Sequence, residues 1–339
     1  MSALVKIAQM MVASGKGILA ADESTGTIGK RFDSIKVENT EENRRAYREM
    51  LFTTKGIGDT ISGVILYDET LRQKCANGTS FVELLNKNGV LPGIKVDAGA
   101  KPLVFCPGET VTEGLDNLPQ RCAEYVKLGA KFAKWRAVID IGVDIPTNTA
   151  IVANAHALAR YAAICQQAGL VPIVEPEVLM DGDHTIERCE QVTEWALNAV
   201  YEALYLNRVS LEGSVLKPSM VISGKGCKQQ ANVEEVADRT VRILKRTVPA
   251  AVAGIVFLSG GQSDELATAH LDAMNKLGNN PWPLSFSYGR ALQQPSLKAW
   301  KGAAENVAAA QMALAHRGRM NSLACLGRYA PNLENRKAA

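Results

Sequence analysis

Eight short apolar runs rich in β-branched residues recur along the chain, with helical patterns between most of them. The runs lie at 17–22, 63–68, 93–97, 132–138, 170–178, 215–221, 254–260 and 284–289. Runs of this kind are typical of buried parallel strands, and spacings of roughly 30 to 45 residues leave room for a crossover helix. Helices are predicted at 148–168, 187–206, 233–247 and 263–277. We therefore predict a single-domain α/β fold, the (β/α)8 TIM barrel.

A doubly wound open sheet is the alternative arrangement of the same elements. It is favoured by a G-x-G-x-x-G turn after the first strand, whereas here the first run continues into Asp22-Glu-Ser-Thr-Gly-Thr27. Because no repeat, low-complexity segment or clear linker divides the chain, we expect one barrel domain over residues 1–325 and a short C-terminal tail over 326–339. The polar stretch 30–48 is interpreted as an insertion and helix start within that domain.

The composition narrows the classes of function. Lys and Arg number 38 against 35 Asp and Glu, and a net charge of +3 is too small to favour a nucleic acid or a membrane surface as partner. The first residues lack a signal-peptide pattern, and no apolar run approaches the ~20 residues that span a bilayer. Seven scattered cysteines without a CxxC motif indicate reduced thiols. We expect a cytoplasmic protein.

Ionisable residues lie near the C-terminal ends of several runs, in pairs spaced by two. Two-residue spacing places both members of a pair on one face of a strand, and we expect that face to point into the top of the barrel, where TIM-barrel enzymes place their active sites. Taken alone, each pair also fits a helix edge or a solvated loop. Together they make a set of four cations and four anions, which can be buried because the charges compensate one another. The three pairs are Lys95 with Asp97, Lys134 with Arg136, and Glu175 with Glu177, and two single residues of other runs, Asp22 and Lys217, complete the set.

Lys217 is a cation inside the apolar run 215–221. Lysine condenses with carbonyl groups, and it must be neutral to attack them. Lys134 is the candidate neighbour whose charge would favour the neutral amine, and the carboxylates can move protons once an imine forms. A protonated imine is an electron sink for breaking a carbon–carbon bond β to the original carbonyl. The alternative is an edge-strand lysine that extends to solvent.

The last two runs end in glycine-containing loops, Leu258-Ser-Gly-Gly-Gln-Ser263 and Ser287-Tyr-Gly-Arg290. Glycine lets backbone N–H groups approach an anion, a serine hydroxyl adds a donor, and an arginine adds charge. The loops after the seventh and eighth strands form the usual phosphate site of this architecture. We predict a phosphate site here, with a plain turn as the alternative.

Eight segments of the chain resemble the motifs of class I fructose-bisphosphate aldolases, and the resemblance covers nearly the whole sequence. It implies a (β/α)8 enzyme, usually a homotetramer, that cleaves the phosphorylated sugar fructose 1,6-bisphosphate into dihydroxyacetone phosphate and glyceraldehyde 3-phosphate without a metal or other cofactor. The segments are LAADESTG at 19–26, EENRR at 41–45, GIKVD at 93–97, FAKWR at 132–136, VPIVEPE at 171–177, LEGSVLKP at 211–218, LSGGQS at 258–263 and FSYGRAL at 286–292.

The resemblance also implies roles for individual residues. Lys217 matches the Schiff-base lysine, and Glu175 matches the general acid/base for carbinolamine dehydration and for the C4 hydroxyl proton. The other matching catalytic residues, which position the intermediate and adjust the charge around it, are Asp22, Lys134 and Glu177. The matching substrate-binding residues are Ser259, Gly260 and Arg290 at the C1 phosphate, Lys95, Ser24 and Thr27 near the C6 phosphate, and Arg31, Arg44 and Arg136. Thr27 stands where animal enzymes have serine, and Arg44, at a helix start, could equally be structural.

One departure concerns the C-terminal end. Animal enzymes of the family carry a terminal tyrosine that reaches the site and favours the bisphosphate, whereas this sequence ends in Asn335-Arg-Lys-Ala-Ala339 and its last tyrosine is Tyr329. The preference between bisphosphate and monophosphate substrates is therefore left open. We expect cleavage of fructose 1,6-bisphosphate to persist without this contact.

Three other interpretations stay open at the level of the sequence. A metal-dependent enzyme on the same barrel would need clustered ligands, whereas the four histidines are far apart and form no H-x-x-x-H pair. A non-catalytic phosphosugar-binding protein would use the same fold. A Schiff-base aldolase with another substrate is the third, although two phosphate sites favour a bisphosphate. The histidines are His156, His184, His270 and His316.

Overall fold

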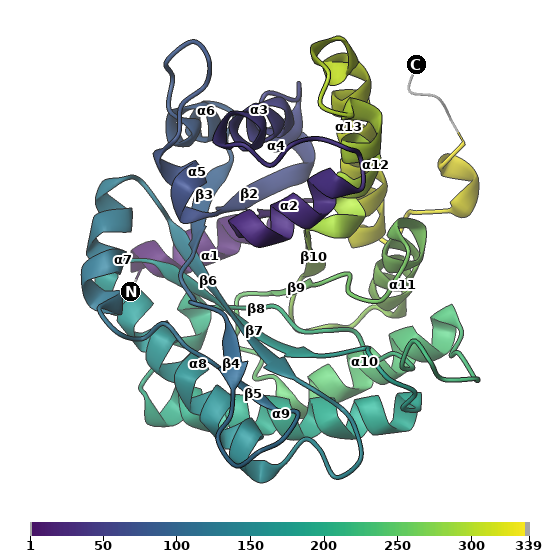
Figure 1. Ribbon diagram of the computed structural model, residues 1–339. Coiled ribbons are helices and arrows are strands. Elements are labelled where there is room, and N and C mark those ends of the chain that lie inside the picture. The colour runs from purple at the N-terminus through teal and green to yellow at the C-terminus, as the bar shows by residue number, and fades with distance from the viewer. Residues whose placement is uncertain (1, 336–339) are drawn as a thin grey trace.

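The computed structural model describes residues 2–335. At its centre eight parallel strands close into a barrel in the order β1-β2-β3-β6-β7-β8-β9-β10, with helices around the outside (Figure 1). Each predicted run overlaps one barrel strand, which confirms the predicted (β/α)8 fold. The strands are β1 (Gly17–Ala21), β2 (Ile61–Leu66), β3 (Leu91–Lys95), β6 (Phe132–Ile139), β7 (Val171–Val178), β8 (Val215–Leu216), β9 (Ile255–Phe257) and β10 (Leu284–Tyr288).

The four predicted helices correspond to α8–α11, and every boundary agrees within one residue. α11 begins at Asp264 because Ser263 is its N-cap, whose hydroxyl accepts a hydrogen bond from the N–H of Leu266 at 3.1 Å. The helices are α1 (Ser2–Met11), α2 (Thr25–Asp33), α3 (Glu41–Phe52), α4 (Ile57–Thr60), α5 (Asp68–Arg72), α6 (Phe81–Lys87), α7 (Leu118–Lys127), α8 (Asn148–Ala168), α9 (Ile186–Leu206), α10 (Val233–Thr247), α11 (Asp264–Leu277), α12 (Arg290–Trp300) and α13 (Val307–Cys325), with 3₁₀ turns η1 (Leu211–Gly213), η2 (Ala304–Asn306) and η3 (Pro331–Leu333).

Three segments differ in detail from the predictions. The run 215–221 contains only the two-residue strand β8, since Pro218 has no N–H to continue the ladder. The polar stretch 30–48 holds the end of α2 and most of α3 rather than a helix start alone. Two unpredicted strands, β4 (Ala100–Pro102) and β5 (Thr110–Thr112), form a small antiparallel sheet beyond β3, and their three-residue length is too short for a periodic pattern.

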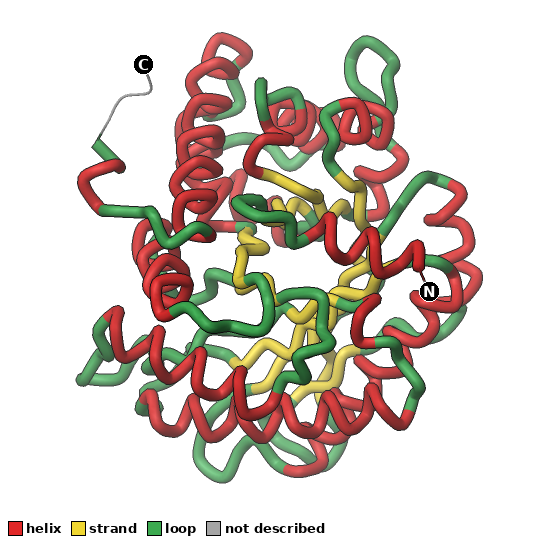
Figure 2. The backbone as a smooth tube through the Cα atoms, turned by 180° about the vertical axis from the view of Figure 1, so that it is seen from behind, coloured by secondary structure: helices red, strands yellow, loops and turns green. Residues whose placement is uncertain are grey.

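The barrel has separate inner and outer hydrophobic cores. Along β1, Ile18 and Ala20 belong to the inner cluster, whereas Leu19 and Ala21 belong to the outer cluster under the helices. This alternation follows from the two-residue period of a strand. The N-terminal end of the inner core is covered by α1, which contributes Leu4, Ala8 and Met11 to the cluster and lies over this end of the barrel when it is seen from behind (Figure 2). The interior is therefore closed at one end and accessible at the other.

We expect the substitution Met11→Ala to lower the free energy of unfolding by about 2–5 kcal/mol, because Met11 is fully buried against the barrel strands and its loss leaves a cavity. Urea-induced unfolding measures the difference. Met10→Ala is the matched control: Met10 lies on the same helix but is 53% exposed, and its replacement should change the free energy by no more than about 0.5 kcal/mol. Equal effects of the two substitutions would contradict the proposed closure by α1.

The described part of the expected tail packs on the outside of the barrel. Tyr329 is buried, and its N–H donates to Asp272 in α11 at 2.8 Å. Glu334 pairs with Arg317 of α13 at 2.6 Å. Residues 336–339 of the tail lie outside the described residues. Within residues 2–335, no helix combines the length and the apolar character needed to cross a membrane.

Candidate active site

A cavity of about 540 Å³ lies at the C-terminal ends of the barrel strands. All the predicted site residues except Arg44 line it, which places side chains from distant parts of the chain around one space. The inner face of each strand explains this arrangement. Phe132 and Ile173 point into the inner core, so the residues two and four positions further along β6 and β7 point to the same side, above it. These residues are Lys134, Arg136, Glu175 and Glu177.

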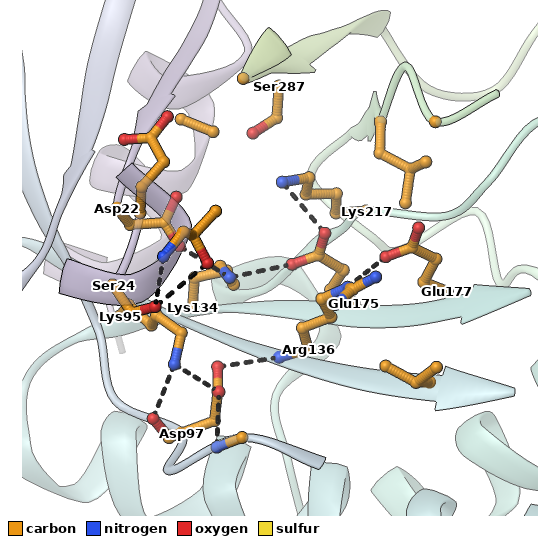
Figure 3. A pocket seen from close by; sticks show the side chains of 18 of the residues that line it. Asp22, Ser24, Lys95, Asp97, Lys134, Arg136, Glu175, Glu177, Lys217 and Ser287 are labelled. Carbon is orange, nitrogen blue, oxygen red and sulfur yellow. Dashed lines mark hydrogen bonds and ion pairs between the residues drawn. The ribbon is translucent and has the colours of Figure 1, made fainter. Parts of the chain in front are cut away.

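Glu175 lies between two lysines on the floor of the cavity. Its Oε1 atom is 3.1 Å from Nζ of Lys217, and its Oε2 atom is 3.5 Å from Nζ of Lys134. Lys134 also pairs with Asp22 at 2.8 Å, and Figure 3 shows the four side chains directed toward one another. The two lysines and Glu175 are each at most 4% exposed. With Asp22, whose side chain is 12% exposed, they form a largely buried, charge-balanced cluster with an amine beside a carboxylate.

The charges of this cluster fix the protonation of two of its members. Burial raises the pKa of Asp22, but the positive charges of Lys134 and Lys217 outweigh it and lower that pKa to about 2. Burial lowers the pKa of Lys134, whereas the charges of Asp22 and Glu175 raise it, and the net pKa lies well above its ordinary value. At neutral pH Asp22 is therefore a carboxylate and Lys134 an ammonium group.

A second set of ion pairs surrounds this cluster. Nζ of Lys95 contacts Oδ1 of Asp97 at 2.5 Å. The other carboxylate oxygen of Asp97 accepts a hydrogen bond from the backbone N–H of Arg136 at 3.3 Å. The guanidinium of Arg136 pairs with Glu177. Burial lowers the pKa of Arg136, and the charge of Glu177 more than reverses this shift. The expected set of four cations and four anions is thus present, and each member contacts a member of opposite charge.

The first turn of α2 brings hydroxyl groups to one side of the cavity. Ser24 is the N-cap of α2, and its Oγ atom lies 3.1 Å from Oγ1 of Thr27. Arg31 also lines the cavity, and its guanidinium pairs with the buried Glu23 at 2.5 Å. Helix N-termini and arginines both favour anions. This side of the cavity can therefore hold a phosphate group.

The loops after β9 and β10 form another anion-binding wall. Gly261 has a φ of +76°, a left-handed conformation that suits glycine. Arg290 lines the cavity and its Nη2 atom donates to the carbonyl oxygens of Ser259, at 3.3 Å, and of Gln262. Its Nη1 atom lies 3.3 Å from Asp264. A guanidinium held beside a glycine turn is a second place where a phosphate group can bind.

Arg44 lies elsewhere. Its guanidinium donates to both carboxylate oxygens of Glu69, at 2.8 and 2.6 Å, and to Oδ1 of Asn39 at 3.0 Å. As far as residues 2–335 define the cavity, Arg44 does not line it. This position favours the structural alternative for Arg44, because its donors are already bound to protein acceptors.

Ser287 and Glu23 line the cavity but are not among the residues predicted to form the site. The Ser287 hydroxyl is 1% exposed and has no hydrogen-bond partner within residues 2–335, which makes it a buried polar group facing the cavity. The two-residue alternation of the last strand run indicates its orientation, since Phe286 and Tyr288 point to the outer core. Glu23 follows Asp22, and no sequence pattern indicates its pairing with Arg31.

We expect the buried imidazole of His270 to make stability depend on pH. Burial lowers the pKa of His270 from 6.5 to about 4, so between these values the unfolded chain binds a proton that the folded chain does not. The contribution is complete above pH 6.5 and is lost as the pH falls toward 4. Relative to His270→Asn, the free energy of unfolding in urea should fall by about 2–3 kcal/mol from pH 7 to pH 4.5. Parallel pH curves for the two proteins would contradict this expectation.

The sequence is similar to proteins of a known family along almost its full length. The family model for class I fructose-bisphosphate aldolases matches residues 3–339. A probable class 1 fructose-bisphosphate aldolase of Xanthomonas campestris pv. campestris is 62% identical over 327 residues, which cover 96% of this chain and 98% of that protein. Fructose-bisphosphate aldolase 5, cytosolic, of Arabidopsis thaliana is 58% identical over 337 residues, which cover 99% of this chain and 94% of that protein.

A solved structure is similarly close. The fructose-bisphosphate aldolase of Plasmodium falciparum, in a ternary complex with TRAP and a small-molecule inhibitor, superposes with a TM-score of 0.96 at 53% sequence identity. The match covers 97% of this chain and 95% of that chain. The sequence motifs, the barrel and the relatives agree, and this chain belongs to the class I fructose-bisphosphate aldolase family.

Proposed function

We propose that Lys217 forms the Schiff base and that Glu175 moves the protons of the reaction. The reaction of the family is the reversible aldol cleavage of fructose 1,6-bisphosphate to dihydroxyacetone phosphate and glyceraldehyde 3-phosphate, a step of glycolysis. The chain is therefore a lyase acting on a phosphorylated sugar. The observation that supports the assignment of residues is the buried Glu175 carboxylate, 3.1 Å from the Lys217 amine and 3.5 Å from Lys134.

The arrangement supports a sequence of balanced steps. The neutral amine of Lys217 attacks the C2 carbonyl of the open-chain ketose, and the resulting carbinolamine loses water when Glu175 protonates its hydroxyl group. The carboxylate of Glu175 then takes the C4 hydroxyl proton, and the C3–C4 bond breaks. The electron pair of that bond moves into the iminium group. Glyceraldehyde 3-phosphate leaves, and the enamine takes up at C3 the proton that Glu175 removed from the C4 hydroxyl. Water then adds to the imine, and its hydrolysis frees dihydroxyacetone phosphate and Lys217.

We assign the neighbouring charges to positioning the intermediate. Lys134 stays protonated, since its pKa is raised by Asp22 and Glu175 against the effect of burial, and it can donate to an oxygen of the sugar. Asp22 stays ionised and can accept a hydrogen bond from a hydroxyl group of the sugar. Glu177, held by Arg136, completes the anionic side of the cavity.

We propose that the two anion-binding sides of the cavity hold the two phosphates of a bisphosphate. The C1 phosphate would lie at Ser259, Gly260 and Arg290. The C6 phosphate would lie at the first turn of α2, near Ser24, Thr27 and Arg31, with Lys95 of β3 beside it. Arg136 also lines the cavity and would contribute to substrate binding. The Ser287 hydroxyl, which has no hydrogen-bond partner within residues 2–335, would donate to the sugar between the two phosphates. Arg44 would support this site indirectly, because its partner Glu69 also contacts Arg48, which in turn pairs with Glu23 of the cavity wall.

Trapping with borohydride tests the assignment of the nucleophile. Reduction in the presence of dihydroxyacetone phosphate should attach one triose phosphate to the chain, and peptide mass mapping should place it on Lys217. Lys134, which lies in the same cluster, is the internal comparison. An adduct on Lys134, or no adduct at all, would overturn the proposed mechanism, while an adduct with dihydroxyacetone but not with its phosphate would overturn the proposed phosphate site.

We also propose a cytoplasmic homotetramer whose barrel domain spans residues 1–325, followed by a tail over 326–339. The relatives named cytosolic in Arabidopsis thaliana and cytoplasmic in Spinacia oleracea support the location. Assembly is supported by large apolar side chains on the surface: Val104 is 73%, Phe105 99% and Val143 91% exposed. Light scattering coupled to size-exclusion chromatography should give four times the mass of the chain, and a monomer would contradict this assembly.

A further inference from the structure

His270 and Gln262 form an isolated polar pair beneath the loop that follows β9. Nδ1 of His270 lies 2.6 Å from Oε1 of Gln262, and the two residues are 3% and 4% exposed. Because the amide oxygen can only accept, Nδ1 carries the proton in this contact. The other side-chain nitrogens of both residues, the two Nε2 atoms, are buried and have no hydrogen-bond partner within residues 2–335. Each side chain is therefore held in its place by the other.

A buried polar pair of this kind costs free energy that an apolar pair would not. The fold itself does not explain it, since α11 has its own N-cap at Ser263 and contributes apolar residues to the outer core. What the pair does determine is the orientation of the Gln262 side chain, and with it the backbone of the loop. The explanation is therefore to be sought in what the loop contacts.

The backbone of Gln262 belongs to the wall of the cavity. Its N–H donates to the carbonyl of Ser259 at 3.3 Å, which closes the turn through Gly260 and Gly261. Its carbonyl oxygen accepts from Nη2 of Arg290, together with the carbonyl of Ser259. A shift of Gln262 would therefore move both the glycine N–H groups and the guanidinium.

The two glycines of this turn are already closely packed. A Cβ atom on Gly260 or Gly261 would collide with Met180, so the turn is packed tightly against that side chain. The contact of Gln262 with His270 is a hydrogen bond rather than packing. Met180 thus limits the space at the glycines, and the hydrogen bond to His270 holds the side chain of Gln262.

We propose that His270 is a positioning residue for the phosphate-binding turn: by holding Gln262 it fixes the Ser259–Gln262 loop and the resting position of Arg290, and so determines how well this wall meets a phosphate group. The inference rests on the proposed C1-phosphate site. It adds a residue that does not touch the substrate, and it predicts a specific defect in phosphate affinity. A misplacement of about 1 Å in a binding group can cost about two orders of magnitude in activity.

The substitution His270→Leu tests the inference, because leucine fills a similar volume and cannot donate. We expect the half-saturating concentration of dihydroxyacetone phosphate for imine formation at Lys217 to rise by about tenfold, the effect of losing one buried hydrogen bond. The KM for fructose 1,6-bisphosphate should rise similarly, with kcat changed less than about threefold. Half-saturation by dihydroxyacetone, which has no phosphate group, should stay unchanged. His270→Asn, whose amide can donate to Gln262, should restore most of the affinity.

Two further variants and one control separate the possible outcomes. Gln262→Met removes the same hydrogen bond from the other side, and the double variant with His270→Leu should be no worse than either single one. His156→Leu repeats the substitution at an exposed histidine and should change nothing. If Arg290→Met leaves the half-saturation by dihydroxyacetone phosphate unchanged, the proposed phosphate site fails and the inference fails with it. If Arg290→Met raises the half-saturating concentration of dihydroxyacetone phosphate but the folded variants His270→Leu and Gln262→Met do not, only the role of His270 is overturned. The same conclusion follows if these two variants affect dihydroxyacetone and its phosphate equally.

Discussion

Replacing Lys217 with methionine is expected to lower kcat for fructose 1,6-bisphosphate by about 10⁵-fold or more, because no covalent intermediate can form. Methionine suits this position: the side chain of Lys217 is 5% exposed, and an unbranched apolar chain of similar length leaves little cavity. Release of triose phosphates, measured in a coupled assay with high enzyme concentration, gives the residual rate. Borohydride should no longer attach dihydroxyacetone phosphate to this variant.

Lys134→Met is the matched comparison for this experiment. Lys134 is equally buried and contacts the same carboxylate, but in the proposed mechanism it stays an ammonium group and forms no bond to carbon. This variant should be slow but still trapped on Lys217 by borohydride. Retention of a substantial rate by Lys217→Met, together with an adduct on Lys134, would show that the two lysines have been assigned the wrong way round.

The fold was predictable because each barrel strand carries its own signal. The run 171–178 is apolar on both faces until it reaches Glu175, since helices cover the outside and side chains fill the inside. The position of the charges on the inner face of the strands was predictable for the same reason. Once Phe132 and Ile173 are assigned to the interior, the two-residue period places Lys134 and Glu175 above them.

The supporting contacts were not predictable, because they join residues that no local period relates. Arg44 reaches Glu69 from α3 to α5, and Glu23 pairs with Arg31 while accepting from Gln293 at 2.8 Å. These choices depend on how helices pack around the barrel, which the sequence specifies only through many weak contacts. A motif therefore identifies Arg44 as a residue of interest, and only its neighbours indicate that it acts from outside the cavity.

Lys217 shows both what the sequence pattern predicts and what it does not. The apolar run predicts a strand through residue 221, but β8 ends at Leu216, and Lys217 is the first residue beyond it. Its N–H still donates to the carbonyl of Val174 at 2.8 Å, so the backbone stays anchored where the regular ladder ends. The amine is thereby held at the rim of the inner core, next to the carboxylate of the neighbouring strand.

Glu175→Gln is expected to lower kcat by about 10³-fold, within the range that general acid–base catalysis contributes. Glutamine keeps the size of the side chain but can neither protonate the carbinolamine hydroxyl nor accept the C4 proton. Folding should survive, because Lys134 keeps Asp22 as a partner at 2.8 Å. Imine formation with dihydroxyacetone phosphate, followed by borohydride trapping over time, should slow along with turnover, since dehydration of the carbinolamine uses the same group.

Glu177→Gln is the control that separates the loss of proton transfer from the loss of a buried carboxylate. Glu177 is also a buried carboxylate on β7, but its partner is Arg136, and its replacement should reduce kcat by only about tenfold, the effect of losing about one hydrogen bond. Glu175→Ala adds a second criterion, because the space left beside Lys217 can admit formate, and added formate should restore part of the rate by taking up the lost proton transfer. Equal losses for Glu175→Gln and Glu177→Gln, with no effect of formate on Glu175→Ala, would mean that the carboxylate between the two lysines only balances their charge and that the proton is carried by another group.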